Sequence, residues 1–337
     1  MVLKKPTQND VARRANVSQA MVSYVLNGAP DVTIPEETRQ RILTAIKELG
    51  YQPSKVARSL RSSKTYTIAG VIPDILNPFY PAFQRGIQDV ADTHNYDLVT
   101  YNTHANPEKE RHFCESLLQG RADGLIAVLF HVTAMDLLPL LERGIPVVRL
   151  EAMYKAPGGY PLDNIYMDNT AASHAAVSYL ISKGHRHIGM LAGQAGPSRH
   201  RIAGYWQALA DHEIAPDESL IETAEFNETG GYTGTKNLLQ RVHNLTAIFA
   251  SNDLMGIGAM QAIREGGLRV PEDIAVVGFD DIPTARLISP GLTTISQHQE
   301  QIGRRAAQML FERLNGATPM GGRTESMPFE LITRQSA

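Results

Sequence analysis

From Thr65 onward, short apolar runs alternate with amphipathic stretches of helical length. The runs read TIAGVIP, DLVTYN, GLIAVLF, PVVRL, NIYMD, HIGMLAG, AIFASN and IAVVGFD, and helical patterns fall near residues 79–94, 107–119, 169–183, 201–212, 230–241, 254–266 and 297–315. This alternation predicts right-handed βαβ units and parallel sheets that are covered by helices on both faces. At least eight strands over this length indicate two sheets and therefore two lobes, with a cleft where the carboxyl ends of the strands meet.

The first fifty residues follow a purely helical pattern. Thr7 is a good N-cap for a helix over residues 8–14, and Asn16 tolerates the left-handed conformation that a tight turn often requires. Capping signals predict a second helix over residues 18–26 and a third that begins near residues 33–35 and ends before Gly50. Three short helices with a four-residue turn between the first two predict a helix-turn-helix domain.

The second of these helices carries residue types suited to reading DNA. Gln19, Ala20 and Tyr24 lie on its outer side, where the helix would meet base edges if it entered a major groove. Gln forms a bidentate pair with adenine, and Ala contacts the methyl group of thymine. Phosphate contacts are expected from Ser18, Ser23, Asn27 and the flanking Arg and Lys residues. The same pattern also fits a helical hairpin that is buried against a neighbouring domain.

Charge is distributed unevenly along the chain. Residues 1–64 hold eleven Lys and Arg against five Asp and Glu, a net charge of +6, so the remainder carries −9 of the overall −3. A basic head on an acidic body indicates that the head binds a polyanion. Cys114, the one cysteine, cannot form an internal disulfide, and neither a membrane-spanning run nor a secretory signal is apparent. We therefore expect a cytoplasmic protein without a membrane partner, metal or cofactor.

Polar and aromatic residues follow several strands of the predicted two-lobed body. Vicinal sugar hydroxyls both donate and accept hydrogen bonds, so planar Asn, Asp, Arg and Gln side chains suit them, and the apolar face of a sugar packs on an aromatic ring. Taken singly, each residue also has a structural explanation as a helix cap, a core residue or a surface charge. Together they predict a sugar site, formed by Asp74, Asn77, Phe79, Arg201, Phe226, Asn252, Asp280 and Gln297.

The N-terminal stretch resembles the LacI/GalR family of bacterial transcriptional repressors. The family pattern T-x-x-D-V-A-x-x-A-x-V-S-x-x-T-V-S-x-V-L-N is matched between Thr7 and Asn27, with Met21 in place of a small Thr. The resemblance adds Thr7 to the expected DNA contacts. It also implies a hinge helix over residues 54–61 that orders on binding to the minor groove, where Leu60 would wedge between base pairs. Further contacts from this segment would be Lys55, Ala57 and Arg58.

The body is similar to the two-lobed periplasmic ribose-binding type of fold, which is the core that LacI/GalR repressors share. Under this resemblance, Glu151 matches an acidic position at the end of its strand, whereas His131 has no assigned role. The predicted sugar-site residues that match ligand-contacting positions of the family are Asn77, Phe79, Arg201, Phe226, Asn252, Asp280 and Gln297.

We therefore expect an α/β protein with an all-α helix-turn-helix head and a two-lobed, doubly wound parallel-sheet core. The expected parts are a DNA-binding domain over residues 1–53, a hinge over 54–64, a first lobe over 65–164 plus 292–337, and a second lobe over 165–291. The expected function is that of a homodimeric repressor of carbohydrate genes that binds a pseudo-palindromic operator under control of a small sugar-like effector.

Other effectors and other functions remain open at this point. A nucleoside, a purine or a protein corepressor would serve the same DNA-binding role. A protein that binds or modifies sugars would need no DNA-binding head. Enzymatic activity is disfavoured, because neither a nucleophile elbow nor a Walker loop appears and the spacing of Gly193 and Gly196 does not fit a dinucleotide site.

Overall fold

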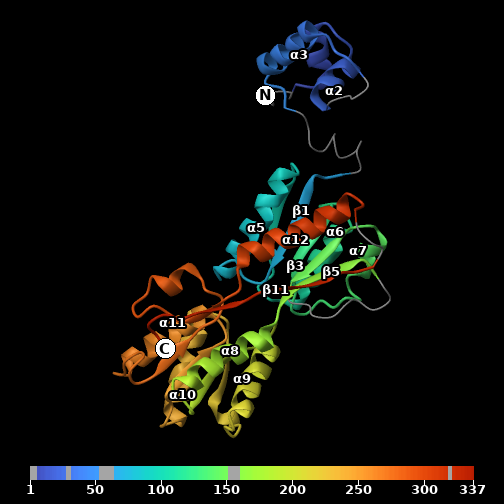
Figure 1. The fold of residues 1–337 in the computed structure, drawn as a ribbon. Helices are drawn as coiled ribbons and strands as arrows, with labels where there is room; N and C mark the ends of the chain where they lie inside the picture. The colour runs from blue at the N-terminus through green and yellow to red at the C-terminus, as the bar shows by residue number, and fades with distance from the viewer. Residues whose placement is uncertain (1–5, 28–31, 53–63, 151–159, 318–320) are drawn as a thin grey trace. The chain divides into compact units, whose positions relative to one another are not determined.

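The computed structural model describes residues 6–27, 32–52, 64–150, 160–317 and 321–337. The chain forms two compact units, Met1–Thr65 and Tyr66–Ala337, which are drawn in Figure 1. The predicted hinge contacts Lys55, Ala57, Arg58 and Leu60 lie outside the described residues, as does Glu151.

The first unit consists of three helices, α1 (Gln8–Ala15), α2 (Gln19–Asn27) and α3 (Glu36–Leu49). Thr7 caps α1 through a reciprocal capping box with Asp10, because each side chain accepts a hydrogen bond from the backbone N–H of the other residue. Asn16 ends α1 with φ of 51° and ψ of 53°, the left-handed conformation that was predicted for the turn. The structure therefore confirms the local signals that define the helical hairpin.

A small core holds these three helices together. Val11, Val22 and Ile42 are completely buried, one from each helix, and Met21 packs against the same cluster. The Met that replaces Thr in the family pattern is therefore a packing residue. An ion pair of 2.6 Å between Arg14 and Glu48 adds a link between α1 and α3.

The first lobe of the second unit is built on a six-stranded parallel sheet. Its strand order is β11-β5-β4-β3-β1-β2, with β1 (Thr67–Ile72), β2 (Asp97–Asn102), β3 (Gly124–Val128), β4 (Val147–Leu150), β5 (Leu162–Met167) and β11 (Thr324–Met327). One face packs against α5 (Phe79–Thr93) and α12 (Gln299–Leu314), and the other against α6 (Pro107–Leu117) and α7 (Leu138–Glu142). Both faces are covered, which explains why the inner strands β1 and β3 read as nearly continuous apolar runs.

The second lobe repeats this arrangement around four parallel strands. Their order is β7-β6-β8-β9, with β6 (Ile188–Gly193), β7 (Ile221–Ala224), β8 (Ala247–Ala250) and β9 (Ala275–Val277). The helices α8 (Asn169–Ser182) and α9 (Ser198–Asp211) cover one face, and α10 (Glu228–Arg241) and α11 (Asp253–Glu265) cover the other. Two short 3-10 turns, Glu218–Leu220 and Pro283–Arg286, complete the lobe.

The returning chain divides between the lobes differently from the prediction. The TTIS segment was expected to complete the first lobe, but β10 (Thr294–Ser296) pairs with β12 (Glu330–Ile332), and Ile295 lies in the core of the second lobe. The last residues of the chain fasten this pair, since the hydroxyl of Ser336 donates to the carbonyl of Val276 and accepts from the N–H of Thr293. Of the described C-terminal residues, those of β11 join the first sheet, and α12 packs on its face.

A buried ion cluster anchors that returning segment. Asp163 on β5 is fully buried and accepts hydrogen bonds from Arg313 of α12 and from Arg323, next to β11, at 2.6–2.8 Å. Burial alone would raise the pKa of Asp163, but the hydrogen bonds from the two guanidinium groups outweigh it and lower the pKa. Three segments that are far apart in sequence are thereby joined at one carboxylate.

Candidate functional site

The outer side of the helix-turn-helix carries the predicted base-reading residues. Ser18, Gln19 and Ala20 are exposed at the start of α2, and 41% of Tyr24 is exposed one turn later. The hydroxyl of Ser18 accepts from the N–H of Met21 at 3.2 Å and so caps the helix, as predicted. The amide of Gln19 donates to Gln8 at 2.6 Å. This contact gives the Gln19 side chain a defined position on the surface of the unit.

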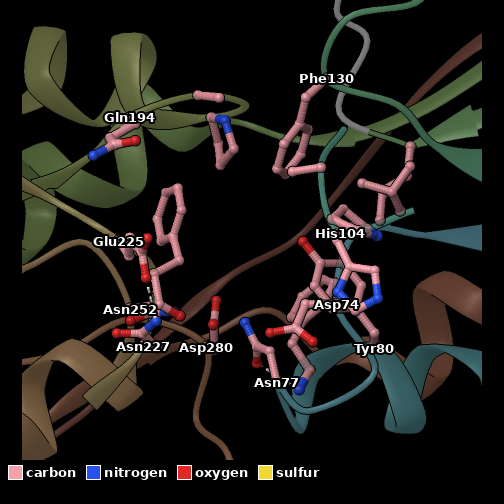
Figure 2. Close-up of a pocket in the computed structure, with 18 of the residues that line it drawn as sticks. Asp74, Asn77, Tyr80, His104, Phe130, Gln194, Glu225, Asn227, Asn252 and Asp280 are labelled. Atoms are coloured by element: carbon pink, nitrogen blue, oxygen red, sulfur yellow. Dashed lines mark hydrogen bonds between the residues drawn. The ribbon is translucent and has the colours of Figure 1, made fainter. Parts of the chain in front are cut away.

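A cavity of about 610 Å³ lies between the two lobes of the second unit. Figure 2 shows Asp74, Tyr80 and His104 of the first lobe across the cavity from Glu225 and Asn227 of the second. Most of the lining residues come from loops and helix starts that follow the carboxyl ends of β1, β3, β6, β7, β8 and β9, as expected for parallel sheets. All eight described residues of the predicted sugar site line it: Asp74, Asn77, Phe79, Arg201, Phe226, Asn252, Asp280 and Gln297.

Arg201 is held rigidly at the second-lobe side of the cavity. The residue is 3% exposed, and its Nε donates to Asn169 at 2.8 Å while Nη1 donates to the carbonyl of Ser251. The guanidinium carbon lies 3.8 Å from the centroid of the Phe279 ring, a cation–π contact. Because Asn169 of α8 and the residues that follow β8 and β9 all contribute to this setting, the guanidinium is held in a fixed orientation in the cavity wall.

Asp280 and Gln297 meet at the point where the chain crosses between the lobes. Asp280 has a positive φ of 120°, unusual for a residue with a side chain, and its Oδ1 accepts from the Nε2 of Gln297 at 2.6 Å. The carbonyl of Asp280 also accepts from Gln299 at the start of α12. Within the described residues, the Oε1 of Gln297 is buried without a hydrogen-bond partner. It is an acceptor that a ligand hydroxyl would satisfy.

Other predicted residues use their polar atoms within the protein. Asn252 accepts from the N–H of Met255 at the start of α11 and donates to the carbonyl of Phe226. In the first lobe, Asp74 accepts from the N–H of Leu76, and Asn77 accepts from the N–H of Phe79. Each of these three side chains thus holds part of the cavity wall through at least one hydrogen bond.

The two predicted aromatic residues differ in exposure. Phe79 is 5% exposed and belongs to the core of the first lobe, and its ring lies edge-on to Tyr80 at a centroid distance of 5.1 Å. Phe226 is half-buried and lies across the end of β6. A Cβ atom on Gly193 would come within 2.1 Å of the Phe226 ring, so only glycine leaves room for it. Phe226 is therefore the more accessible of the two aromatic surfaces.

Several lining residues were not predicted from the sequence. His104, Phe130, Gln194, Glu225 and Asn227 lie in loops that follow strands, and His131, which had no assigned role, lies beside Phe130. The sequence signal that could have identified these residues is their position just after the ends of strands. Loop length and direction decide which of them reach the cavity, and neither can be read from one sequence.

Asp253 supports the cavity wall from behind. It is fully buried, and its carboxylate accepts from the hydroxyl of Thr294 at 2.5 Å and from the N–H of Ile282 at 2.8 Å. Desolvation raises the pKa of Asp253 to about 7, although the hydrogen bonds from Thr294 and Ile282 oppose this increase. One carboxyl group thus ties the start of α11, the segment after Asp280 and the crossing strand β10 together.

Two further properties concern metals and membranes. In the parts of the chain that the structure describes, no three or more His, Cys, Asp and Glu side chains gather in a group that could hold a metal ion. None of the described helices has both the length and the apolar character required to span a bilayer.

Comparisons with known proteins find a matching family for each of the two units. Residues 7–54 match the model for bacterial regulatory proteins of the lacI family, and residues 177–337 match a periplasmic binding protein-like domain. The ribose operon repressor of Escherichia coli strain K12 is 35% identical over 333 residues, which cover 98% of this chain and 99% of the relative. The chain belongs to the LacI family.

Other members of the LacI family are similar over the same span. The HTH-type transcriptional repressor PurR of Edwardsiella ictaluri strain 93-146 is 35% identical over 334 residues, 98% of this chain and 96% of that protein. The structure of the lac repressor dimer bound to operator and the anti-inducer ONPF has a TM-score of 0.86 at 27% identity, covering 99% of both chains. This LacI-family protein is a DNA-binding transcriptional repressor with a helix-turn-helix head and a periplasmic-binding-protein-like core.

Proposed function

We propose that this LacI-family repressor controls carbohydrate genes and that a small sugar bound in the cavity between its lobes switches its affinity for the operator. The cavity at the crossing between the lobes carries this proposal. It combines a fixed guanidinium from Arg201, a carboxylate from Asp280 and a buried amide oxygen from Gln297 with the half-buried ring of Phe226. Planar polar groups beside an aromatic surface suit a polyhydroxylated ring.

The switch is proposed to act through the relative position of the lobes. A ligand that contacts both lobes favours the arrangement in which both sets of contacts are made. The ligand changes operator affinity only to the extent that its own affinities for the two arrangements of the lobes differ. The cavity is lined from both lobes, so a sugar seated there would have such a preference.

The DNA side of the proposal rests on the exposed start of α2. We propose that Gln19, Ala20 and Tyr24 contact base edges, and that Thr7, Ser18 and Ser23 contact phosphates. Asn27, whose side chain lies outside what the structure describes, is proposed as a phosphate contact from the sequence alone. The hinge contacts Lys55, Ala57, Arg58 and Leu60 are proposed from the family resemblance alone. Two heads in a cytoplasmic homodimer would read the two halves of a pseudo-palindromic site. The protein would act by binding alone.

A purine or nucleoside effector is the second candidate. Two imidazoles, from His104 and His131, line the first-lobe side of the cavity together with Phe130, and flat heterocycles stack well on such surfaces.

The experiment is a thermal-shift screen of the purified full-length protein with pentoses, hexoses, nucleosides and purine bases, followed by calorimetry of each hit. Operator binding at fixed salt is then measured with and without that ligand. We expect a sugar to raise the melting temperature and to change operator affinity. A change caused by a purine alone would decide for the alternative, and binding of neither class would refute the proposal.

Two arginines in the first turns of α9 provide a matched pair of variants. Arg201 is buried against the cavity, whereas Arg199 is exposed two residues earlier. Arg201→Ala should abolish the ligand response and leave operator affinity without ligand nearly unchanged, and Arg199→Ala should behave like the wild type. If Arg201→Ala also destroys operator binding while the protein stays folded, Arg201 serves the structure of the repressor and not its ligand.

A further inference from the structure

An aromatic ring joins the two lobes at one end of the cavity. Phe130 follows β3 of the first lobe, and Gly196 follows β6 of the second. A Cβ atom on Gly196 would lie 2.5 Å from the Phe130 ring, so the ring is packed directly on the glycine backbone. The φ of +62° at Gly196 is also one that glycine adopts without strain. The space that receives the ring therefore depends on the absence of a side chain at this position.

A buried carboxylate fixes the segment that carries this ring. Glu110 of α6 is fully buried, and its two oxygens accept hydrogen bonds from the backbone N–H groups of Phe130, His131 and Val132 at 2.9–3.1 Å. Three charge-assisted hydrogen bonds to consecutive amides leave this backbone little freedom to move. The Nε2 of His131 also lies 3.0 Å from the carbonyl of Ala105, which connects the segment to the loop after β2. Glu110 is thus a positioning residue for Phe130.

Asn77 and Asp280 lie at the end of the cavity opposite Phe130 (Figure 2). Gln297 meets Asp280 there through the 2.6 Å hydrogen bond, so the ring of a sugar would be held at the end where the chain crosses between the lobes. A substituent that extends from this ring toward the Phe130 end would meet the aromatic ring that is packed on Gly196.

We propose that Phe130 sets an upper limit on the size of the effector, so that the cavity accepts a one-ring sugar and rejects a ligand with a second ring. This inference rests on the proposed function, because it assumes that the effector binds in the cavity. It adds that Phe130 is a specificity-determining residue and that Glu110 holds it in place.

The test uses the full-length protein and matched ligand pairs, measured by calorimetry. Each pair contains a one-ring sugar and its extended counterpart, namely glucose with cellobiose, galactose with lactose, and ribose with adenosine. For the pair whose smaller member binds, the wild type should bind the larger member at least about tenfold more weakly, a discrimination typical of steric exclusion from a pocket. Phe130→Ala should reduce this discrimination by about tenfold and leave the affinity for the smaller member within about threefold.

Variants of Glu110 and Gly196 test the mechanism. Glu110→Gln replaces one accepting oxygen by an N–H donor, so it should release the Phe130 segment and lower the discrimination in the same direction as Phe130→Ala. Glu115→Gln changes an exposed carboxylate of the same helix and serves as the control. Gly196→Ala should displace the ring of Phe130. The double variant Phe130→Ala, Gly196→Ala should bind the ligand pairs as Phe130→Ala does, apart from the effect of backbone strain at φ of +62°.

The outcomes separate this inference from the proposed function. If the wild type binds none of the compounds, the proposed function is refuted and the size limit with it. If the wild type binds a one-ring compound and its extended counterpart equally well, the function stands and the size limit is wrong. The same conclusion follows if the wild type discriminates but Phe130→Ala discriminates to the same extent.

Discussion

The buried carboxyl group of Asp253 predicts a specific dependence of stability on pH. Its pKa is raised from 3.8 to about 7 in the folded protein, mainly because burial disfavours the charged form. A carboxyl group whose pKa is higher in the folded than in the unfolded state makes its full contribution to stability at low pH, where it is protonated in both states. That stability is lost as the pH rises from the unfolded value of 3.8 to the folded value of about 7, and the loss levels off above pH 7.

The size of the effect follows from the two pKa values. A difference between 3.8 and about 7, at about 1.4 kcal/mol per unit, corresponds to a total of about 4 kcal/mol. Roughly 2–3 kcal/mol of this change falls between pH 5 and pH 8. Asp253→Asn removes the titration, and its amide can still accept from the N–H of Ile282 and donate to the hydroxyl of Thr294. The variant should therefore gain stability relative to the wild type by this amount between pH 5 and pH 8.

Urea unfolding at a series of pH values measures this difference. Trp206, the one tryptophan of the chain, lies in α9 and reports on the second lobe separately from the helix-turn-helix unit. Glu272→Gln, which changes an exposed carboxylate of the same lobe, is the control and should follow the wild-type curve. A stability difference between wild type and Asp253→Asn that stays constant within about 0.5 kcal/mol from pH 5 to pH 8 would show that Asp253 is ionised throughout, contrary to its burial.

Three other substitutions test separate parts of the structure. Arg313→Ala should destabilise the second unit by about 3–5 kcal/mol in urea unfolding, because it leaves the buried carboxylate of Asp163 with one fewer partner; a loss below about 1 kcal/mol would contradict this. Gly193→Ala should displace the ring of Phe226 and weaken sugar binding about tenfold or more by calorimetry, whereas unchanged affinity would show that this ring does not contact the ligand. Gln19→Ala should reduce the difference in binding free energy between the operator and base-substituted operators by about 1–3 kcal/mol. Gln40→Ala on α3 is the control, and equal behaviour of the two variants would exclude base contact by Gln19.

The helix-turn-helix unit could be predicted almost completely, because its signals are local. The cap at Thr7, the left-handed turn at Asn16 and the inward positions Val11 and Val22 each depend on residues within one or two helical turns. The structure confirms all of them. Met21 was the uncertain position, and its contact with the small core shows that a larger side chain can be accommodated there.

The second unit was predictable in its alternation of strands and helices but not in its long-range pairings. Eight of the strands coincide with the predicted runs, whereas β7, with the sequence IETA, is too short and polar to stand out. The assignment of β10 depends on its antiparallel partner β12, in which Glu330 pairs with Ser296, 34 residues earlier, and on the hydrogen bond between Thr293 and Ser336. Such pairings are decided by tertiary packing, which periodicity in one sequence does not record.

The same limit applies to the cavity. Side chains directly at strand ends, such as Asp280 and Asn252, were identified because parallel strands bring these positions to one edge. Phe130 and Glu110 were not, since their relation is a contact between a loop and a helix twenty residues earlier. Gly193 and Gly196 had only been considered for a dinucleotide site. Each instead leaves room for an aromatic ring, Phe226 in one case and Phe130 in the other.

The positions of the polar groups bear on how a ligand could control the two lobes. Asp280 and Gln297 flank the segment that crosses from the second sheet to α12, and their mutual hydrogen bond lies in the cavity wall. Asp253 binds the same segment from behind through Ile282 and Thr294. A ligand that hydrogen-bonds to Asp280 or Gln297 therefore acts directly on residues whose backbone must rearrange if the lobes move. Since a ligand shifts a conformational equilibrium only by its difference in affinity for the two states, contacts at this crossing would contribute more to the switch than equally strong contacts within one lobe.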